Sequence, residues 1–258
     1  MDKFDEIISQ YRMVYDHHTH TVYSHGKGTI EDNVREAALK GLKSIAITDH
    51  GPGHLTYGIK RKDMPQMRAE IAALKEKYPS VEVLLGVEAN TLRRKPYLDI
   101  TPEEGKEFDI VLAGYHFGIL GAGMVTNYMN TRAGMLDSEY SKLKVKNTAM
   151  IVDALYYNED EGNHISILTH PGDKGPFDIK EIARVCQDTG TLIEINDKHH
   201  HLNVEEIQIA SAFDVNFVIS SDAHIAKKVG SYEGPFRRAL EAGLDPARIV
   251  NLEKIQRL

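Results

Sequence analysis

The chain has 258 residues, 41% of them hydrophobic and 27% charged, which describes an ordinary soluble globular protein. Its length matches one (β/α) barrel of about 250 residues, although two small domains would also fit. The formal net charge of -7 at pH 7 argues against a surface that coats nucleic acid, because such surfaces are usually basic.

Three features concern the cellular compartment. The single cysteine, Cys186, excludes an internal disulfide and suits a reducing cytosol. The first six residues contain neither the basic nor the apolar region of a secretory signal. No apolar run approaches the roughly 20 residues that a membrane helix needs. We therefore expect a cytoplasmic protein without a membrane partner.

Apolar residues follow the strand and the helix pattern in turn along the chain. After a helix at residues 2–12, a first strand leads into the histidine-rich stretch 15–26. Further strands are predicted at residues 43–50, 81–88, 108–116, 165–170, 191–196 and 216–224. Further helices are predicted at residues 29–41, 65–78, 102–107, 138–158, 178–189, 203–213 and 236–243, and residues 118–132 are expected to form a long loop.

This alternation decides the fold class. Strands that alternate with helices indicate parallel strands joined by crossovers. Seven such units predict an α/β barrel one unit short of eight, and an open doubly wound sheet is the alternative. No linker, low-complexity tract or change of composition divides the chain, so we expect one domain over residues 1–258.

Polar groups stand at the end of every predicted strand. They are His18 and His20, Asp49 and His50, Glu88, His116, His170, Glu194 and Asn196, and Asp222 and His224. In a barrel of parallel strands these ends lie on one face, where barrel enzymes keep their active sites. A lone histidine there is more often a hydrogen-bonding loop residue than a ligand. Repetition at five strand ends, with carboxylates in matching places, indicates a metal cluster instead, and His25 is close enough in sequence to join it.

The other histidines are interpreted more simply. His17 alternates away from His18 and is expected to pack behind the sheet, and His164 should lie on the face opposite the site. His54 is expected in solvent, in a loop near the site. The run 199–201 follows the sixth strand and is not expected to take part in catalysis. Residues 93–95, two arginines and a lysine, are expected to form a solvated surface rather than a phosphate contact.

Seven short motifs carry a family resemblance. They are His18-Thr19-His20, Ser24-His25-Gly26, Ile47-Thr48-Asp49-His50, Gly86-Val87-Glu88, Gly114-Tyr115-His116, Leu168-Thr169-His170-Pro171 and Ser221-Asp222-Ala223-His224. In order, and over nearly the whole chain, they resemble the motif set of the polymerase-and-histidinol-phosphatase (PHP) superfamily. The stand-alone size is similar to that of the small phosphatase-type members.

The resemblance implies a distorted seven-stranded (β/α)7 TIM-like barrel with a trinuclear metal centre. One metal would be held by His18, His20, Glu88 and Asp222. Glu88 would bridge to a second metal, which His116 and His170 also hold. The third would be held by His25, His50 and His224. Two features depart from the family: many members have aspartate at the His25 position, and the run 199–201 is not one of its motifs.

The donor set predicts the chemistry. Imidazole-rich sites suit zinc, manganese or iron rather than magnesium or calcium, which prefer oxygen ligands. Three divalent ions with two carboxylates would leave the centre positive and favour an anionic substrate. Metal binding lowers the pKa of water towards about 7, so a bridging hydroxide is expected to attack phosphorus in line. Asp49 is a candidate to orient an imidazole or to carry a proton.

We therefore expect a phosphatase acting on a small phosphomonoester, with L-histidinol phosphate as one candidate. A phosphodiesterase or exonuclease is the alternative enzyme, but the lack of a basic groove disfavours nucleic acid as a partner. A non-catalytic metal-binding module should have lost a ligand, and none is missing. An amidohydrolase is disfavoured because no lysine ends a strand. The residues that bind the substrate are not predicted, because specificity lies in loops such as 118–132.

Overall fold

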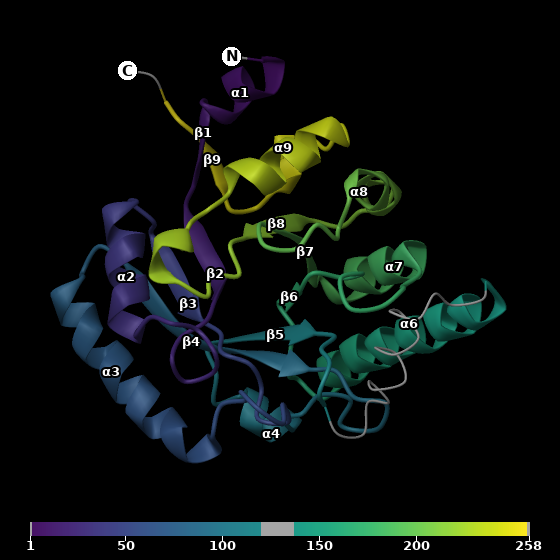
Figure 1. The fold of residues 1–258 in the computed structure, drawn as a ribbon, viewed down its shortest axis with the longest axis horizontal. Helices are drawn as coiled ribbons and strands as arrows, with labels where there is room; N and C mark the ends of the chain where they lie inside the picture. Colours follow the sequence, from purple (N-terminus) through teal and green to yellow (C-terminus); the bar gives the residue numbers. More distant parts are fainter. Residues whose placement is uncertain (1, 120–136, 257–258) are drawn as a thin grey trace.

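The computed structural model describes residues 2–119 and 137–256 (Figure 1). Within these residues, one parallel sheet has the strand order β2-β3-β4-β5-β6-β7-β8. Its strands are β2 (Tyr15–Thr19), β3 (Ser44–Ile47), β4 (Glu82–Asn90), β5 (Ile110–Gly114), β6 (Ile167–Leu168), β7 (Leu192–Asn196) and β8 (Phe217–Ser220). The order is that of a barrel opened at one seam, between β2 and β8.

Helices surround this sheet (Figure 1). They are α1 (Lys3–Ile8), α2 (Ile30–Leu39), α3 (Met64–Lys77), α4 (Pro102–Gly105), α6 (Asp137–Asp160), α7 (Ile179–Thr189), α8 (Val204–Ser211) and α9 (Glu233–Glu241), with short 3-10 turns at Arg61–Asp63, Ala226–Lys228 and Pro246–Arg248. None of the helices in the described ranges is long and apolar enough to cross a membrane.

Capping residues set several helix ends where the sequence predicts them. The Thr29 hydroxyl oxygen accepts a hydrogen bond from the backbone N–H of Asp32, and the Asp32 carboxylate accepts one from the backbone N–H of Thr29, which makes a capping box. Asn203 and Glu206 form the same arrangement at α8. Gly190 ends α7 in the left-handed conformation, at φ 72°, which a residue with a side chain adopts only at a cost.

Side chains and one short bridge close the seam between β2 and β8. The backbone N–H of His20 donates to Ala223 O at 2.9 Å. Fully buried Asn251 donates to Tyr15 O at 2.8 Å and Ile219 O at 2.7 Å, and accepts from Ile219 N–H at 3.0 Å. Because this contact joins the first and last strands, the predicted barrel is confirmed and the open doubly wound sheet is not.

Asp16 adds a buried carboxylate to the same seam. It accepts hydrogen bonds from the Ser221 hydroxyl and from Gly230 N–H, the latter at 2.8 Å. Burial raises the pKa of Asp16, and these hydrogen bonds oppose that rise. Strand β2 is therefore tied to the segments after β8 although no ladder joins them.

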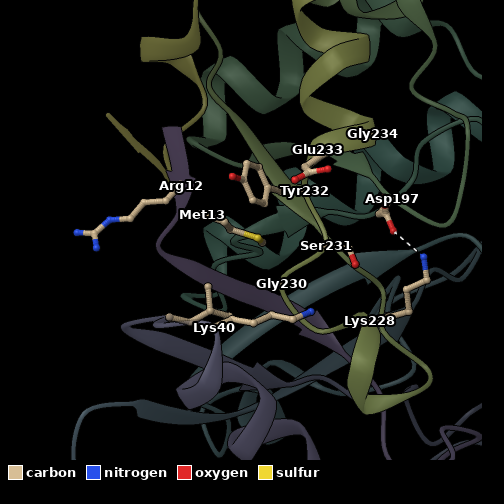
Figure 2. Close-up of a pocket in the computed structure, with 11 residues that line it drawn as sticks. Arg12, Met13, Lys40, Asp197, Lys228, Gly230, Ser231, Tyr232, Glu233 and Gly234 are labelled. Atoms are coloured by element: carbon tan, nitrogen blue, oxygen red, sulfur yellow. Dashed lines mark ion pairs between the residues drawn. The ribbon is translucent and has the colours of Figure 1, made fainter. Parts of the chain in front are cut away.

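A groove of about 550 Å³ lies near this seam (Figure 2). Arg12, Lys40 and Lys228 are among its lining residues, and each has a partner already. Arg12 is 2.9 Å from Glu253, Lys40 donates to Lys227 O at 2.9 Å, and Lys228 is 3.8 Å from Asp197. None of the nine predicted metal donors lines this groove, so it is not the predicted metal site.

The interior of the barrel is apolar at one end and polar at the other. Leu112, Ile167 and Val218 form a small buried cluster, with Tyr15 and Leu192 packed against it. Side chains alternate along a strand, so the next inward positions lie one layer closer to the carboxyl ends. There the strands carry polar groups. The apolar layer is thus the floor on which the polar layer rests.

The first predicted helix is too long. Residues 2–12 were expected to be helical, but α1 ends at Ile8, and β1 (Tyr11–Met13) pairs antiparallel with β9 (Leu252–Lys254). The partner strand comes from the far end of the chain, where local sequence patterns cannot reveal it. The other predicted helices and strands are present with shifted ends, and residues 120–132 of the predicted loop lie outside the described residues.

Candidate metal centre

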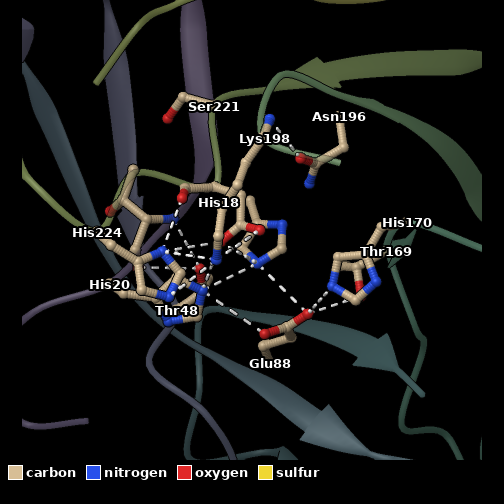
Figure 3. Close-up of polar contacts among 12 residues, drawn as sticks. His18, His20, Thr48, Glu88, Thr169, His170, Asn196, Lys198, Ser221 and His224 are labelled. Carbon is tan, nitrogen blue, oxygen red and sulfur yellow. Dashed lines mark hydrogen bonds and ion pairs between the residues drawn. The ribbon is translucent and has the colours of Figure 1, made fainter. Parts of the chain in front are cut away.

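The predicted donors converge at the carboxyl ends of the strands, as Figure 3 shows for those that it labels. They are His18, His20, His25, His50, Glu88, His116, His170, Asp222 and His224. The Nε2 atoms of His18 and His20 are 3.1 Å apart, and His20 Nε2 is 3.1 Å from Asp222 Oδ1. The expected convergence of His18 and His20 is confirmed.

Glu88 lies at the middle of this cluster and is fully buried. Its Oε1 is 2.9 Å from His170 Nε2, 3.2 Å from His116 Nε2 and 3.4 Å from His18 Nε2. Its Oε2 is 2.9 Å from His50 Nδ1 and 3.6 Å from His20 Nε2. One carboxylate therefore faces five imidazoles, two through one oxygen and three through the other, as a bridging ligand does.

The described residues contain four overlapping sets of three donors, and within each set the donor atoms all lie within 4.8 Å of one another. They are His20, His50 and His224; His18, His20 and Glu88; His18, His170 and Asp222; and His50, Glu88 and His116. His25 is in none of these sets. Its ring lies beside the first, with its centroid 4.1 Å from that of His224 and 4.9 Å from that of His50.

The buried polar atoms show that this site fits a metal. Among the described residues, no hydrogen bond reaches His20 Nδ1, His50 Nδ1, Glu88 Oε2, His116 Nε2 or Asp222 Oδ1. His50 Nδ1 and Glu88 Oε2 are close, but not in hydrogen-bond geometry. A buried polar atom without a partner costs about 1–3 kcal/mol. Divalent cations shared among these atoms would remove that cost.

The electrostatics give most of the donors the protonation state that a metal requires. Burial alone would raise the pKa of Glu88, but His116, His18 and His50 hold it well below its usual range. Burial lowers the pKa of His20, His50 and His170. Ionised carboxylates and neutral imidazoles are the forms that bind divalent metals.

Outer hydrogen bonds orient the predicted donors on the β7 side. Glu194 Oε1 is 2.6 Å from His18 Nδ1, which leaves His18 Nε2 facing the cluster. Glu194 Oε2 accepts from the backbone N–H of His170 at 2.7 Å. His170 and Asp222 have positive φ values, 28° and 49°, which residues with side chains rarely adopt. Backbone strain of this kind gathers at functional sites.

On the β4 side, Asn90 and Asp99 orient His116. The Oδ1 of Asn90 is 2.8 Å from His116 Nδ1, so His116 Nε2 points towards Glu88. Half-buried Asp99 in turn accepts from Asn90 N–H at 2.8 Å and from Gly53 N–H at 2.7 Å. Neither Asn90 nor Asp99 was predicted to support the site. The position of Asn90, two residues beyond Glu88 on the same face of β4, was the available signal.

Asp49 lies against the turn that carries His25. It accepts hydrogen bonds from Thr21 N–H at 2.7 Å, from the Thr21 hydroxyl at 2.6 Å and from the Ser24 hydroxyl at 2.5 Å. No imidazole is among these hydrogen-bond partners. Asp49 therefore holds the turn that carries His25 against the end of β3, and its part in orienting an imidazole or carrying a proton stays a prediction.

The expectation that His17 packs behind the sheet is wrong. The register of β2 against β3 shifts between Asp16 and Thr19. His17 stacks on Tyr15, with ring centroids 4.2 Å apart, and lies 2.9 Å from the hydroxyl of Ser44. Tyr15 packs against the apolar floor of the barrel. The irregularity thus lets the neighbours His17 and His18 both face inward, which strict alternation would forbid.

Other peripheral residues were predicted with mixed success. His54 is not in solvent: it is 8% exposed and stacks on Tyr57 with ring centroids 3.6 Å apart. His164 is exposed and pairs with Glu159 at 2.7 Å, away from the cluster. Residues 93–95 are exposed, as expected.

The segment after β7 approaches the site, which was not predicted. His199 Nδ1 is 3.0 Å from Asp173 Oδ1, and His199 Nε2 is 3.2 Å from Asp222 Oδ2. Burial opposes protonation of His199, but the hydrogen bonds to Asp173 and Asp222 hold its pKa above the ordinary value. Lys198 reaches the same carboxylate at 3.5 Å. His201 instead pairs with Glu206, and His200 is exposed.

Gly114 leaves room for the cluster and provides a test of its packing. A Cβ there would overlap His116 Cε1 and would lie 2.6 Å from Thr169 Oγ1 and 2.8 Å from Glu88 Oε1. We expect Gly114→Ala to displace ligands and to lower metal affinity at least about 10-fold, as loss of an outer partner does. Metal per chain, measured by mass spectrometry after dialysis, checks this. Gly28→Ala, where the added Cβ meets atoms no closer than 3.4 Å, should keep its metal.

Comparisons with known proteins agree with this geometry. The family model of the PHP domain matches residues 16–198. A "Probable phosphatase" of Proteus mirabilis is 30% identical over 248 residues, which cover 92% of this chain and 89% of that protein. Another "Probable phosphatase", from a Thermoanaerobacter species, is 30% identical over 257 residues, or 94% of this chain and 91% of that protein.

A solved structure shares the fold. The histidinol phosphate phosphatase of Lactococcus lactis, complexed with zinc, L-histidinol and phosphate, superposes with a TM-score of 0.61 at 18% identity. The match covers 90% of this chain and 95% of that one. With the domain match over most of its length and relatives aligned almost end to end, the chain belongs to the PHP domain family.

Proposed function

We propose that the protein is a metal-dependent phosphatase that hydrolyses a small phosphomonoester. The observation that carries the proposal is the convergence of seven imidazoles and two carboxylates around Glu88. The relatives named as phosphatases support the reaction class. The Lactococcus protein was solved with L-histidinol and phosphate, so an amino-alcohol phosphate of that kind is our first candidate substrate.

We propose three divalent ions, each zinc, manganese or iron. The first would be held by His18, His20, Glu88 and Asp222, the second by Glu88, His116 and His170, and the third by His25, His50 and His224. Short distances among the donors support the first two groups, and the close rings of His25 and His224 support the third. When bound, such ions lower the pKa of water and neutralise phosphoryl oxygens.

The protein's own residues position these groups. Glu194 and Asn90 fix the imidazoles of His18 and His116 with Nε2 directed at the cluster. Glu88 keeps its negative charge at the centre. In the reaction, the bond between phosphorus and the alcohol oxygen breaks and a bond to a water oxygen forms. Water loses a proton and the leaving alcohol gains one, so no further reactant is needed.

The test is hydrolysis of p-nitrophenyl phosphate by protein reconstituted with manganese or zinc, with metal content verified. We expect release of p-nitrophenol that a chelator stops and added metal restores. Parallel assays with bis-(p-nitrophenyl) phosphate and with a short oligonucleotide test the diesterase alternative. Metal-loaded protein that cleaves none of these, and no member of a panel of phosphorylated metabolites, would refute the proposal.

A further inference from the structure

We propose that Lys198 is the residue that receives the phosphate group and selects monoesters over diesters. This inference rests on the proposed phosphatase function and extends it to substrate class. The Nζ of Lys198 lies 3.2 Å from both ring nitrogens of His224 and 3.5 Å from Asp222 Oδ2. Its side chain extends from the end of β7 towards the cluster, and 42% of it is exposed, so a ligand can reach it (Figure 3).

The positive charge of Lys198, next to the predicted metal donors, favours binding of an anion. Asp222 Oδ2 already lies 3.2 Å from His199 Nε2, so this oxygen is shared between His199 and Lys198. With divalent ions held by Asp222 and His224, the ammonium would face a positive centre. Like charges at such short range repel, the more so because the side chains of Asp222 and His224 are only 3% and 17% exposed to bulk water. An anion between the ammonium and the metal centre turns that repulsion into attraction on both sides.

The backbone at this corner is held firmly in place. The Asn196 side-chain oxygen accepts from the N–H groups of Lys198 and His199, both at 2.9 Å. From α9, Arg238 donates to the carbonyl of Asn196 and, at 3.2 Å, to that of His199. The backbone of Lys198 is therefore fixed before a ligand binds, so binding costs little conformational entropy there.

The same placement explains selectivity between esters. A phosphomonoester offers three terminal oxygens and about two negative charges at neutral pH, whereas a diester offers two oxygens and one charge. A single added cation therefore strengthens binding of the monoester more than that of the diester. The alternative is that Lys198 serves only as a counterion to Asp222, in which case its loss would disturb metal binding and both esters alike.

The experiment compares Lys198→Met, Lys198→Arg and a control, Lys227→Met, on manganese-loaded protein. Lys227 is exposed in the short 3-10 turn after β8, and its carbonyl oxygen, not its side chain, accepts the hydrogen bond from Lys40. Three quantities are measured: metal per chain, the Kd of inorganic phosphate by calorimetry, and kcat/KM for p-nitrophenyl phosphate and for its bis ester.

We expect Lys198→Met to keep its metal, to raise the phosphate Kd about 10- to 100-fold, and to lose monoesterase kcat/KM by a similar factor. Diester hydrolysis should change less than about 3-fold. Lys198→Arg should retain most of the phosphate affinity, and Lys227→Met should match the wild type.

Three outcomes would overturn the inference: an unchanged phosphate Kd in Lys198→Met, an equal loss for both esters, or a loss of metal in that variant. Failure of the proposed function is separate, since it would show as wild-type, metal-loaded protein without activity on any ester. In that case phosphate calorimetry still reports whether Lys198 binds the anion.

Discussion

Replacement of Glu88 by glutamine is expected to remove most phosphatase activity and to lower metal content. Glu88 is within 3.6 Å of five imidazoles, and the substitution removes its charge and one oxygen. Outer partners of a metal site are each worth about 10- to 100-fold. A central ligand should be worth more, so kcat/KM for p-nitrophenyl phosphate should fall by more than about 100-fold.

Glu82→Gln is the matched control, because Glu82 is exposed at the other end of the same strand. Its kcat/KM and metal content should equal those of the wild type. Circular dichroism of each variant verifies that it is folded. A folded Glu88→Gln protein with full metal content and wild-type activity would contradict the assignment of Glu88 as the shared ligand.

Replacement of Asn251 by alanine is expected to cause the largest loss of stability. Asn251 makes three hydrogen bonds to Tyr15 and Ile219 across the seam of the barrel and is fully buried. Without it, backbone groups of both strands are left buried and unpaired, at about 1–3 kcal/mol each. The free energy of unfolding should fall by at least about 3 kcal/mol, measured by urea denaturation at constant metal content.

Asn216→Ala serves as the control, since Asn216 is exposed at the start of β8. It should change the free energy of unfolding by less than about 0.5 kcal/mol. A loss below about 1 kcal/mol for Asn251→Ala would mean that the ladder and the helices hold the barrel closed without this side chain.

The convergence of the donors could be predicted because two local rules act together. Strands that alternate with helices must run parallel, and parallel strands bring their carboxyl ends to one edge. Glu88, His116 and His170 each end such a strand, so their meeting follows without knowledge of distances. The floor of Leu112, Ile167 and Val218 follows from the same alternation.

Local rules failed where the chain departs from regular geometry or pairs with distant residues. His17 turned inward because β2 changes register, which no pattern of neighbours reveals. Strand β1 was predicted as helix because its partner, β9, is at the other end of the sequence. The chain folds back after β4 and brings Asp99 against Asn90. The indirect contact of Asp99 with His116 through Asn90 was therefore not predicted.

Local sequence patterns were enough to establish the order of the seven sheet strands and their helices, the face on which the histidines gather and the kinds of atoms they present. These follow from periodicity, because side chains repeat every two residues in a strand. Which loops fold back over that face was not predictable and is seen in the folded chain alone. The fold places Lys198 and His199 beside Asp222, and Asp49 beneath the turn that carries His25. Those positions depend on contacts between residues far apart in the chain, such as Arg238 with Asn196, and periodicity carries no information about them.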